Sequence, residues 1–303
     1  MMRIFIDGAA GTTGLEIETR LTGRPEFELL KLDDSARKNA AARKDALNAA
    51  DIVILCLPDD AAREAVSLID NSHTRVIDAS TSFRTTTGWT YGFPELGNDV
   101  AGAMRVSNPG CYPTGFLALV TPLIRAGLIP KDWPITVNAV SGYSGGGKAM
   151  IAEFESGQPQ AAWRTYALTL AHKHIPEMQR HSGLSHGPIF APSVASTYRG
   201  MIVEVPLHLG AMPAQPSVAI VREALAQAFS GSSIVTLPQP PELLTVNQAA
   251  DSDRLDLFVF GNAEGTQARL VAALDNLGKG ASGAAVQSLN LMAGLPETTG
   301  LRL

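Results

Sequence analysis

The chain has 303 residues, 45% hydrophobic and 17% charged, which predicts a globular protein with a large core and excludes a disordered one. Its net charge of −5 and the lack of a long basic run argue against nucleic acid or an anionic membrane surface as a partner. The first residues predict a strand and a turn rather than a signal peptide, and no apolar segment reaches membrane-spanning length, so we expect a cytoplasmic protein.

The first half of the chain alternates short apolar strands with helical stretches. The hydrophobic pattern predicts helices at 14–23, 36–49 and 59–70, and strands at 3–8, 27–34, 51–58 and 75–80. The run DIVILCLP at 51–58 is continuously apolar, as is typical of a strand covered on both faces. This α/β alternation predicts a Rossmann-like, doubly wound parallel sheet.

After about residue 115 the strict alternation ends. We expect helices at 217–229 and 283–295, and strands near 135, at 199–209 and at 255–262. This pattern predicts an α+β domain with a mixed or antiparallel sheet. We therefore expect a dinucleotide-binding domain at 1–114 and a catalytic, substrate-binding and oligomerisation domain at 115–280. The last segment, 281–303, is expected to pack back on the first domain.

Glycines separate the first predicted strand from the first predicted helix. Gly8, Gly11 and Gly14 form a G-x-x-G-x-x-G pattern that includes Thr12 and Thr13. Small residues at such a turn let the backbone approach a pyrophosphate, which the free N–H groups of the helix N-terminus can then bind. The alternative is a tight strand-to-helix turn with no ligand.

The end of the second predicted strand bears on the choice of dinucleotide. Asp33 or Asp34 is placed to bind the ribose of NAD, whereas Ser35, Arg37 and Lys38 can hold a 2′-phosphate. We predict NADP(H) as the cofactor. The alternative is that Arg37 and Lys38 belong to a solvated helix face.

The two cysteines lie in unlike surroundings. Cys56 lies in the apolar 51–58 run and is expected to be structural. Cys111 follows the turn-forming Pro109-Gly110 pair and precedes Pro113, which suits the first position of a helix. A helix N-terminus lowers the pKa of a thiol, so Cys111 is a candidate nucleophile, the alternative being a surface cysteine without a role. No disulfide framework or zinc site is indicated.

Further candidates lie in two polar segments. In AHKHIPE, His172 and His174 would share a face if the segment is extended, and either can act as acid and base for a nearby thiol. Glu177 can orient a histidine or bind a cationic group, and a metal site is not expected. The SGYSGGGK segment at 141–148 can cradle a phosphate through backbone N–H groups. Arg84 can bind a carboxylate or phosphate, or form a structural ion pair.

Taken together, these segments resemble N-acetyl-gamma-glutamyl-phosphate reductases, relatives of the aspartate-semialdehyde dehydrogenases. The resemblance covers roughly the first 180 residues, its most specific parts being N-P-G-C-Y-P-T and H-x-H-x-P-E, and the compact length resembles a shorter subgroup. The last 120 residues carry no recognisable motif. The similar segments are DGAAGTTG (7–14), LPDDAA (57–62), DASTSFR (78–84), YGFPEL (91–96), SNPGCYPTG (107–115), SGYSGGGK (141–148) and HKHIPEM (172–178).

The resemblance implies an aldehyde-forming oxidoreductase of the EC 1.2.1 type. It would reduce N-acetyl-L-glutamyl 5-phosphate with NADPH to N-acetyl-L-glutamate 5-semialdehyde and phosphate, through a thioester on Cys111, in arginine biosynthesis. His172 or His174 would be the acid–base group, and the sequence does not decide between them. A homo-oligomer, dimer or tetramer, would follow. Substrate contacts would come from Arg84, Asn108, Ser141, Gly142 and Glu177, and further cofactor contacts from Pro58 and Ser80.

Two alternatives to this activity remain. A related semialdehyde dehydrogenase would use aspartyl or aminoadipyl phosphate instead. A non-catalytic NADP-binding sensor could share the fold, because fold alone does not fix function. The presence of both Cys111 and the histidine pair argues against the sensor.

Overall fold

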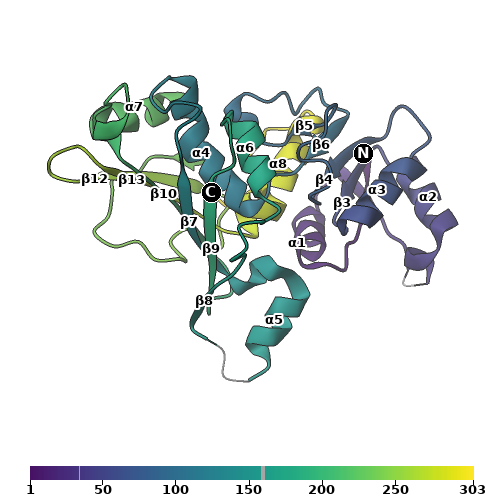
Figure 1. Cartoon of the computed structure of the whole chain (residues 1–303). Helices are drawn as coiled ribbons and strands as arrows, with labels where there is room; N and C mark the ends of the chain where they lie inside the picture. Colours follow the sequence, from purple (N-terminus) through teal and green to yellow (C-terminus); the bar gives the residue numbers. More distant parts are fainter. Residues whose placement is uncertain (34, 158–160) are drawn as a thin grey trace. The chain divides into compact units, whose positions relative to one another are not determined.

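The computed structural model describes residues 1–33, 35–157 and 161–303, with Lys38 described by its backbone alone. The chain forms two compact units, shown with their element labels in Figure 1. The first comprises Met1–Pro109 and Ala281–Leu301, and the second comprises Gly110–Gly280 and Arg302–Leu303. The domain division expected from the sequence, at residues 114 and 280, stays a prediction.

The first unit is built on a parallel sheet with the order β2-β1-β3-β4-β6-β5, which confirms the predicted doubly wound class. β3 is buried at every position, as its continuous apolar sequence requires. The six strands are β1 (Met2–Asp7), β2 (Phe27–Leu30), β3 (Ile52–Leu55), β4 (Arg75–Asp78), β5 (Thr90–Tyr91) and β6 (Arg105–Ser107).

Helices cover both faces of this sheet. Ile17 and Leu21 of α1 share a hydrophobic cluster with Val286 and Leu289 of α8, against Ile4, Ile52 and Ile77 of the strands. On the other face, α2 and α3 pack on Phe5, Val53 and Val76. The C-terminal helix therefore completes the core of the first unit. The helices are α1 (Thr12–Leu21), α2 (Ala40–Ala49), α3 (Asp59–Leu68) and α8 (Gly283–Met292), with short 3₁₀ turns at Ala36–Lys38 and Pro94–Leu96.

The continuous helix expected at 36–49 is wrong in its first turn. Residues Ala36–Lys38 form a 3₁₀ turn, and α2 begins only after Asn39. The Asn39 side chain accepts hydrogen bonds from the N–H groups of Ala41 and Ala42. An N-cap of this kind requires a non-helical backbone at the capping residue, which separates the two helical segments.

The second unit holds a seven-stranded mixed sheet with the order β11-β12-β13-β10-β7-β9-β8. Two neighbouring pairs, β11–β12 and β7–β9, are parallel and the others are antiparallel, so the expectation of a mixed sheet is confirmed. The strands are β7 (Thr136–Gly142), β8 (Trp163–Thr165), β9 (Ile189–Ala195), β10 (Met201–Leu207), β11 (Val235–Thr236), β12 (Leu255–Gly261) and β13 (Ala268–Leu274).

Helix α4 (Cys111–Arg125) lies on one face of this sheet and is buried along most of its length. Its close approach requires a glycine, because a Cβ at Gly115 would lie 2.9 Å from a Val203 methyl group. None of the described helices is both long enough and apolar enough to cross a bilayer. The other helices of the unit are α5 (Gly147–Glu155), α6 (Ile175–Ser182) and α7 (Val218–Ala228), with 3₁₀ turns at Tyr143–Gly146 and Leu209–Ala211, and a π-helical segment runs over Gly278–Ser282.

Candidate active site and cofactor site

The glycine turn after β1 has the backbone geometry that only glycine tolerates. Gly8 has φ +90°, and a Cβ there would lie 2.3 Å from the Cys56 carbonyl oxygen. At Gly14 a Cβ would lie 2.4 Å from the Gly8 oxygen. Gly11 is the N-cap of α1 and no side chain caps it, so the first-turn N–H groups, including those of Thr12 and Thr13, lack acceptors within the helix.

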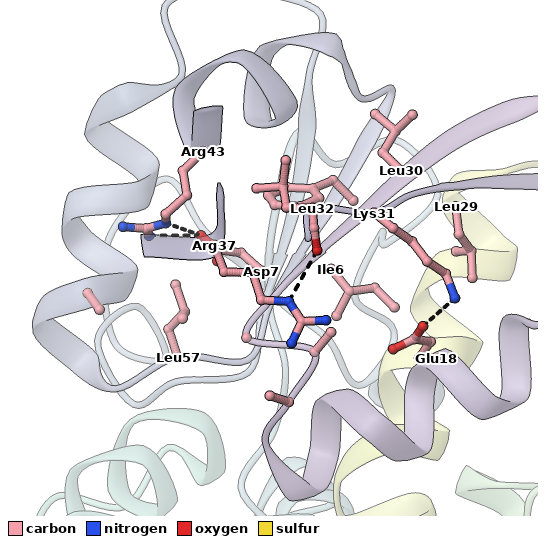
Figure 2. Close-up of a pocket in the computed structure, with 15 residues that line it drawn as sticks. Ile6, Asp7, Glu18, Leu29, Leu30, Lys31, Leu32, Arg37, Arg43 and Leu57 are labelled. Atoms are coloured by element: carbon pink, nitrogen blue, oxygen red, sulfur yellow. Dashed lines mark hydrogen bonds and ion pairs between the residues drawn. The ribbon is translucent and has the colours of Figure 1, made fainter. Parts of the chain in front are cut away.

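A cavity of about 420 Å³ opens beside this turn. Its lining comes from β1 and the turn after it, from β2 and the residues after it, from α1 and α2, and from Leu57 and Ala61 before and within α3 (Figure 2). Most of the lining is aliphatic, which suits the flat face of a nucleotide base. The residues that contribute to it include Gly8, Ala9 and Ala10 of the turn and the side chains of Leu29, Leu30, Leu32, Leu57 and Ala61.

Three cations line the same cavity. The Arg43 guanidinium donates to Asp7 Oδ2 through Nε at 3.2 Å and through a terminal nitrogen at 2.8 Å. Arg37 Nε donates to the Leu32 carbonyl at 3.2 Å, and Lys31 pairs with a Glu18 carboxylate at 2.6 Å. Figure 2 shows all three arrangements. Arg43 was missed in the sequence because it lies mid-helix among alanines, where a basic residue ordinarily faces solvent.

Among the other predicted cofactor residues, Ser35 is not part of the lining of this cavity. Ser35 is exposed, and its hydroxyl donates to Asp33 Oδ1 at 2.6 Å. That carboxylate also accepts the backbone N–H groups of Ser35 and Ala36, and these bonds, led by the Ser35 hydroxyl, lower the Asp33 pKa. Asp34 and the Lys38 side chain lie outside the described part of the chain.

Pro58 and Ser80 lie at the carboxyl ends of β3 and β4. Pro58 is the N-cap of α3, where its carbonyl accepts the Ala62 N–H at 2.9 Å. The Ser80 hydroxyl is buried and donates to Asp78 Oδ2 at 2.7 Å. Desolvation raises the pKa of the Asp78 carboxyl to about 6, although the Ser80 hydrogen bond opposes this shift. The cofactor roles of Pro58 and Ser80 stay predictions.

These residues fit a dinucleotide. The crowded Gly8 and Gly14 positions let a pyrophosphate approach the uncapped start of α1. The aliphatic cavity provides room for an adenosine, and Arg37 and Arg43 bring positive charge to its lining. No group of three or more potential metal ligands occurs among the described residues.

In the second unit, Cys111 is the first residue of α4 and Gly110 is the N-cap. This corrects the expectation that the helix begins at Pro113, which instead occupies the third position. Proline is tolerated there because the N–H groups of a first turn have no helical acceptor. The Thr114 N–H bonds the Gly110 carbonyl at 2.9 Å, and no side chain caps the start of the helix.

Cys56 contrasts with Cys111. It lies directly after β3, and its backbone N–H donates to the Asp7 carbonyl at 2.8 Å. Desolvation, and then the nearby Asp78 and Asp7 carboxylates, raise the pKa of the Cys56 thiol to about 12. A thiol in such surroundings is inert at neutral pH.

The segment that carries the histidines turns rather than extends. His174 has a helical backbone conformation and is the N-cap of α6, so the expected alternation of an extended strand is wrong here. The turn nevertheless brings the two imidazoles together, with the ring centroids of His172 and His174 4.7 Å apart. Glu177, three residues into α6, is 1% exposed, and its Oε1 accepts the Gly110 N–H at 2.8 Å.

Two tyrosines missed in the sequence surround the histidines. The Tyr112 ring lies 6.2 Å from His172 and 5.9 Å from His174, measured between centroids. The Tyr166 hydroxyl lies 3.0 Å from that of Tyr112, which donates to the Ser193 carbonyl at 3.2 Å. Desolvation raises the pKa of Tyr166 to about 12. An aromatic residue after a cysteine gives no functional signal, because such residues are usually core.

The SGYSGGGK segment is held by hydrogen bonds along its first half. The N–H groups of Gly142, Tyr143 and Ser144 donate to the carbonyls of Gly200, Thr197 and Tyr198. These three N–H groups are therefore already bonded and do not form the phosphate nest expected at this end. Its second half starts α5, a helix that the sequence pattern did not predict.

Asn276 fixes this segment from the far end of the chain. Its Nδ2 donates to the Ser144 hydroxyl at 2.8 Å, and its Oδ1 accepts the Gly200 N–H at 2.9 Å. Ser141 lies close by, since a Cβ at Gly145 would be 3.1 Å from the Ser141 hydroxyl. Substrate contacts by Ser141 and Gly142 stay predictions.

Arg84 and Asn108 belong to the first unit. The buried Arg84 donates from Nε to the Asn108 carbonyl at 2.9 Å and from a terminal nitrogen to the Ala79 carbonyl at 3.1 Å. Asn108 donates to the Ala281 carbonyl at 3.0 Å. Its buried Oδ1 has no hydrogen-bond partner among the described residues. An orphaned acceptor of this kind is suited to an amide or hydroxyl group of a ligand.

Comparison with known proteins agrees with both units. The family model described as semialdehyde dehydrogenase, NAD binding domain, matches residues 3–104. The model described as semialdehyde dehydrogenase, dimerisation domain, matches residues 111–276. Among solved structures, aspartate semialdehyde dehydrogenase II from Vibrio cholerae superposes with a TM-score of 0.69 at 17% identity, covering 97% of this chain and 99% of the other. This likeness concerns the fold.

Sequence relatives are much closer. The chain is 49% identical over 318 residues to N-acetyl-gamma-glutamyl-phosphate reductase 2 from Nostoc sp., covering 99% of both chains. It is 51% identical over 304 residues to N-acetyl-gamma-glutamyl-phosphate reductase from Rhizobium etli, covering 96% of this chain and 98% of the relative.

A dinucleotide-binding unit joined to a mixed-sheet unit with a helix-terminal cysteine defines an aldehyde-forming oxidoreductase of the semialdehyde dehydrogenase class. Half of the residues are shared with the relatives over nearly the full length of both chains. The chain therefore belongs to the N-acetyl-gamma-glutamyl-phosphate reductase family.

Proposed function

We propose that this protein reduces N-acetyl-L-glutamyl 5-phosphate to N-acetyl-L-glutamate 5-semialdehyde and phosphate, with NADPH, as a step of arginine biosynthesis. The observation that carries the proposal is the placement of Cys111 at the uncapped N-terminus of α4, in a unit that also holds the histidine pair. The full-length identity to reductases named for this substrate supports it over aspartyl and aminoadipyl phosphates.

The residues around the cavity of the first unit would hold the cofactor. Gly8, Gly11 and Gly14 would admit the pyrophosphate, and Arg37 and Arg43 would carry the charge that a 2′-phosphate requires. When bound, NADPH supplies the hydride that reduces the acyl group.

The nucleophilic step would belong to Cys111. Its sulfur attacks the acyl carbon, a C–S bond forms, the bond from carbon to the phosphate oxygen breaks, and phosphate leaves. The N-terminus of α4 carries the positive end of the helix dipole and no side-chain cap, so it is suited to stabilise the oxyanion of this step. A histidine would accept the thiol proton and later give it to the oxyanion that hydride transfer leaves on the former acyl carbon. When the resulting hemithioacetal collapses, the hydroxyl proton is removed, the C–S bond breaks, the aldehyde leaves and the sulfur takes up a proton to restore the thiol.

The predicted substrate contacts stay Arg84 and Asn108 in the first unit and Ser141 and Gly142 in the second. The orphaned Asn108 acceptor supports a role toward a ligand amide. The buried Glu177 carboxylate accepts a backbone N–H next to the nucleophile, so we infer that it also shapes the turn.

The reaction can be tested in reverse. Purified protein should reduce NADP⁺ in the presence of phosphate and N-acetyl-glutamate semialdehyde, with much weaker activity on aspartate semialdehyde. A preference for aspartate semialdehyde would move the chain to the related dehydrogenases. Tight NADPH binding without turnover of either aldehyde would favour a sensor.

We further propose a homo-oligomer formed through the β7–β9 part of the mixed-sheet face opposite α4. On that face Ile202, Phe258 and Val271 are buried in a cluster with Ala249, whereas at β7 and β9 Ile189 is 55% exposed and Ala191 and Asn138 are also exposed. A charged side chain at this face should split the oligomer. In analytical ultracentrifugation, Ile189→Asp should lower the assembly mass, whereas Leu243→Asp, a change at another exposed leucine, should not. Cytoplasmic location stays a prediction.

A further inference from the structure

His172 organises the start of α6 through two hydrogen bonds. Its Nδ1 accepts the backbone N–H of His174 at 3.1 Å, and its carbonyl accepts the Ile175 N–H at 3.0 Å. A ring nitrogen that accepts a hydrogen bond carries no proton, so this arrangement requires the neutral tautomer with the proton on Nε2. The imidazole thus serves as a cap for the backbone that places His174.

The His172 ring is enclosed by four other rings. The centroid distances are 4.7 Å to His174, 5.1 Å to Phe190, 5.8 Å to Tyr166 and 6.2 Å to Tyr112. Three of the four contacts come from different elements, namely β9, the segment after β8, and α4. A ring held from several sides and bonded through Nδ1 has little freedom to turn toward a substrate.

The surroundings of the His172 ring also oppose its protonation. Desolvation, and then the Lys173 ammonium, lower the pKa of His172 to about 4. The titratable groups that face it are the Tyr112 phenol on α4, the Tyr166 phenol after β8 and the neighbouring His174, while β9 presents the uncharged Phe190. His174 is 6% exposed, and its ring packs on Tyr112, the residue that follows Cys111.

We propose that His172 is a permanently neutral positioning residue and that His174 is the acid–base group of the reaction. The second half rests on the proposed function. His172 acts through the backbone of His174 and the first turn of α6, and that turn carries Glu177, which holds the Gly110 N–H beside the nucleophile. Removal of the Nδ1 acceptor therefore disturbs Cys111 only indirectly.

Four variants separate the two roles. In His172→Asn the side-chain oxygen can still accept the backbone N–H of His174, as in an Asx turn. His172→Phe keeps an aromatic ring but has no acceptor. His174→Asn removes the proposed acid–base group, and His186→Asn changes an exposed histidine of the same unit as a control. For each, kcat/KM for phosphate-dependent NADP⁺ reduction is measured against pH.

His174→Asn should lower kcat/KM by roughly 10²–10⁴ and remove an ionisation near neutrality. For His172→Asn, kcat/KM should stay within roughly tenfold of the parent value, because a loss of that size corresponds to one neutral hydrogen bond. The ionisation near neutrality should remain. His172→Phe should lose more than His172→Asn, yet keep the same pH profile. The proposal is overturned if His172→Asn loses the ionisation, or if His174→Asn keeps both rate and profile.

A second measurement needs no substrate. In protein labelled with ¹⁵N-histidine, the His172 ring nitrogens, assigned with the His172→Asn variant, should keep the shifts of the neutral tautomer between about pH 5 and 8. A titration within that range overturns the positioning role. If the parent protein does not turn over the substrate, the proposed reaction fails while this result on His172 still stands.

Discussion

The Glu177 carboxylate accepts the backbone N–H of Gly110 at 2.8 Å and so connects the first turn of α6 to the residue that caps α4. Gly110 immediately precedes Cys111, and Glu177 is 1% exposed. A buried charge-assisted hydrogen bond of this kind fixes a backbone turn more firmly than a neutral one. The nucleophile and the histidine pair are thereby positioned by one interaction.

Glu177→Ala should destabilise the second unit and slow the reaction. The change leaves the Gly110 N–H buried without its acceptor, which costs about 1–3 kcal/mol. Glu177→Gln keeps an acceptor oxygen at the same reach and should restore most of the loss in denaturant unfolding. If Glu177→Ala and Glu177→Gln lower the free energy of unfolding equally, the negative charge of the carboxylate matters rather than its hydrogen bond to Gly110.

Cys111→Ser should keep the fold and cofactor binding but lose nearly all turnover. A hydroxyl at this position is a far poorer nucleophile than a thiol at neutral pH. Brief treatment with iodoacetamide should label Cys111 and leave Cys56, whose raised pKa keeps it protonated, unmodified in mass spectra. Preferential labelling of Cys56, or an active Cys111→Ala enzyme, contradicts the assignment.

The first unit was largely predictable because its local pattern and its tertiary contacts agree. Its β3 is a short apolar run buried at every position, and each predicted strand and helix exists to within a few residues, although the short strands β5 and β6 were not predicted. The second unit was only half predictable. Strands β8, β9, β11 and β13 and helices α5 and α6 were missed. The missed strands are ordered by partners distant in the sequence.

The site shows the same limit at the level of single residues. Spacing indicated that His172 and His174 lie together, but their relation depends on a turn that an H-x-H pattern does not reveal. Arg43 and Asn276 act through partners 36 and 76 positions away, Asp7 and Gly200, and no local pattern marks them. Site residues that stand in a sequence motif could therefore be predicted, whereas site residues defined only by long-range contacts could not.

Arg37→Ala should weaken NADPH binding selectively. Loss of a hydrogen bond to a charged phosphate costs roughly 1.5–3 kcal/mol, whereas NADH lacks that phosphate and should bind almost as before. Arg43→Ala should weaken both cofactors to some degree, because its pair with Asp7 also supports the cavity. Lys44→Ala, next to Arg43 but outside the cavity lining, serves as the charge-matched control in fluorescence titrations. Equal losses of NADPH and NADH in Arg37→Ala would place the 2′-phosphate elsewhere.

The buried Asp78 and the half-buried His172 should give opposite pH dependences of stability over one window. The pKa of Asp78 is raised to about 6 in the folded chain, so between about pH 4 and 6 the folded state binds more protons than the unfolded state. Its contribution is present at low pH and is lost as pH rises through 6. The pKa of His172 is lowered to about 4, so its contribution is present above about pH 6.5 and is lost as pH falls toward 4.

Because these slopes have opposite signs, the parent protein should show a shallow pH profile of unfolding free energy across this range, and the variants should separate the two. Asp78→Asn can still accept the Ser80 hydrogen bond, and it should gain stability relative to the parent as pH rises from 4 to 7, by an amount on the order of 3 kcal/mol. His172→Asn should lose the decline at low pH and leave the Asp78 slope exposed. Urea unfolding at half-unit steps of pH, followed by a probe in each unit, measures both. If Asp78→Asn runs parallel to the parent at every pH, the pKa of the Asp78 carboxyl is the same in the folded and unfolded chains and this assignment is wrong.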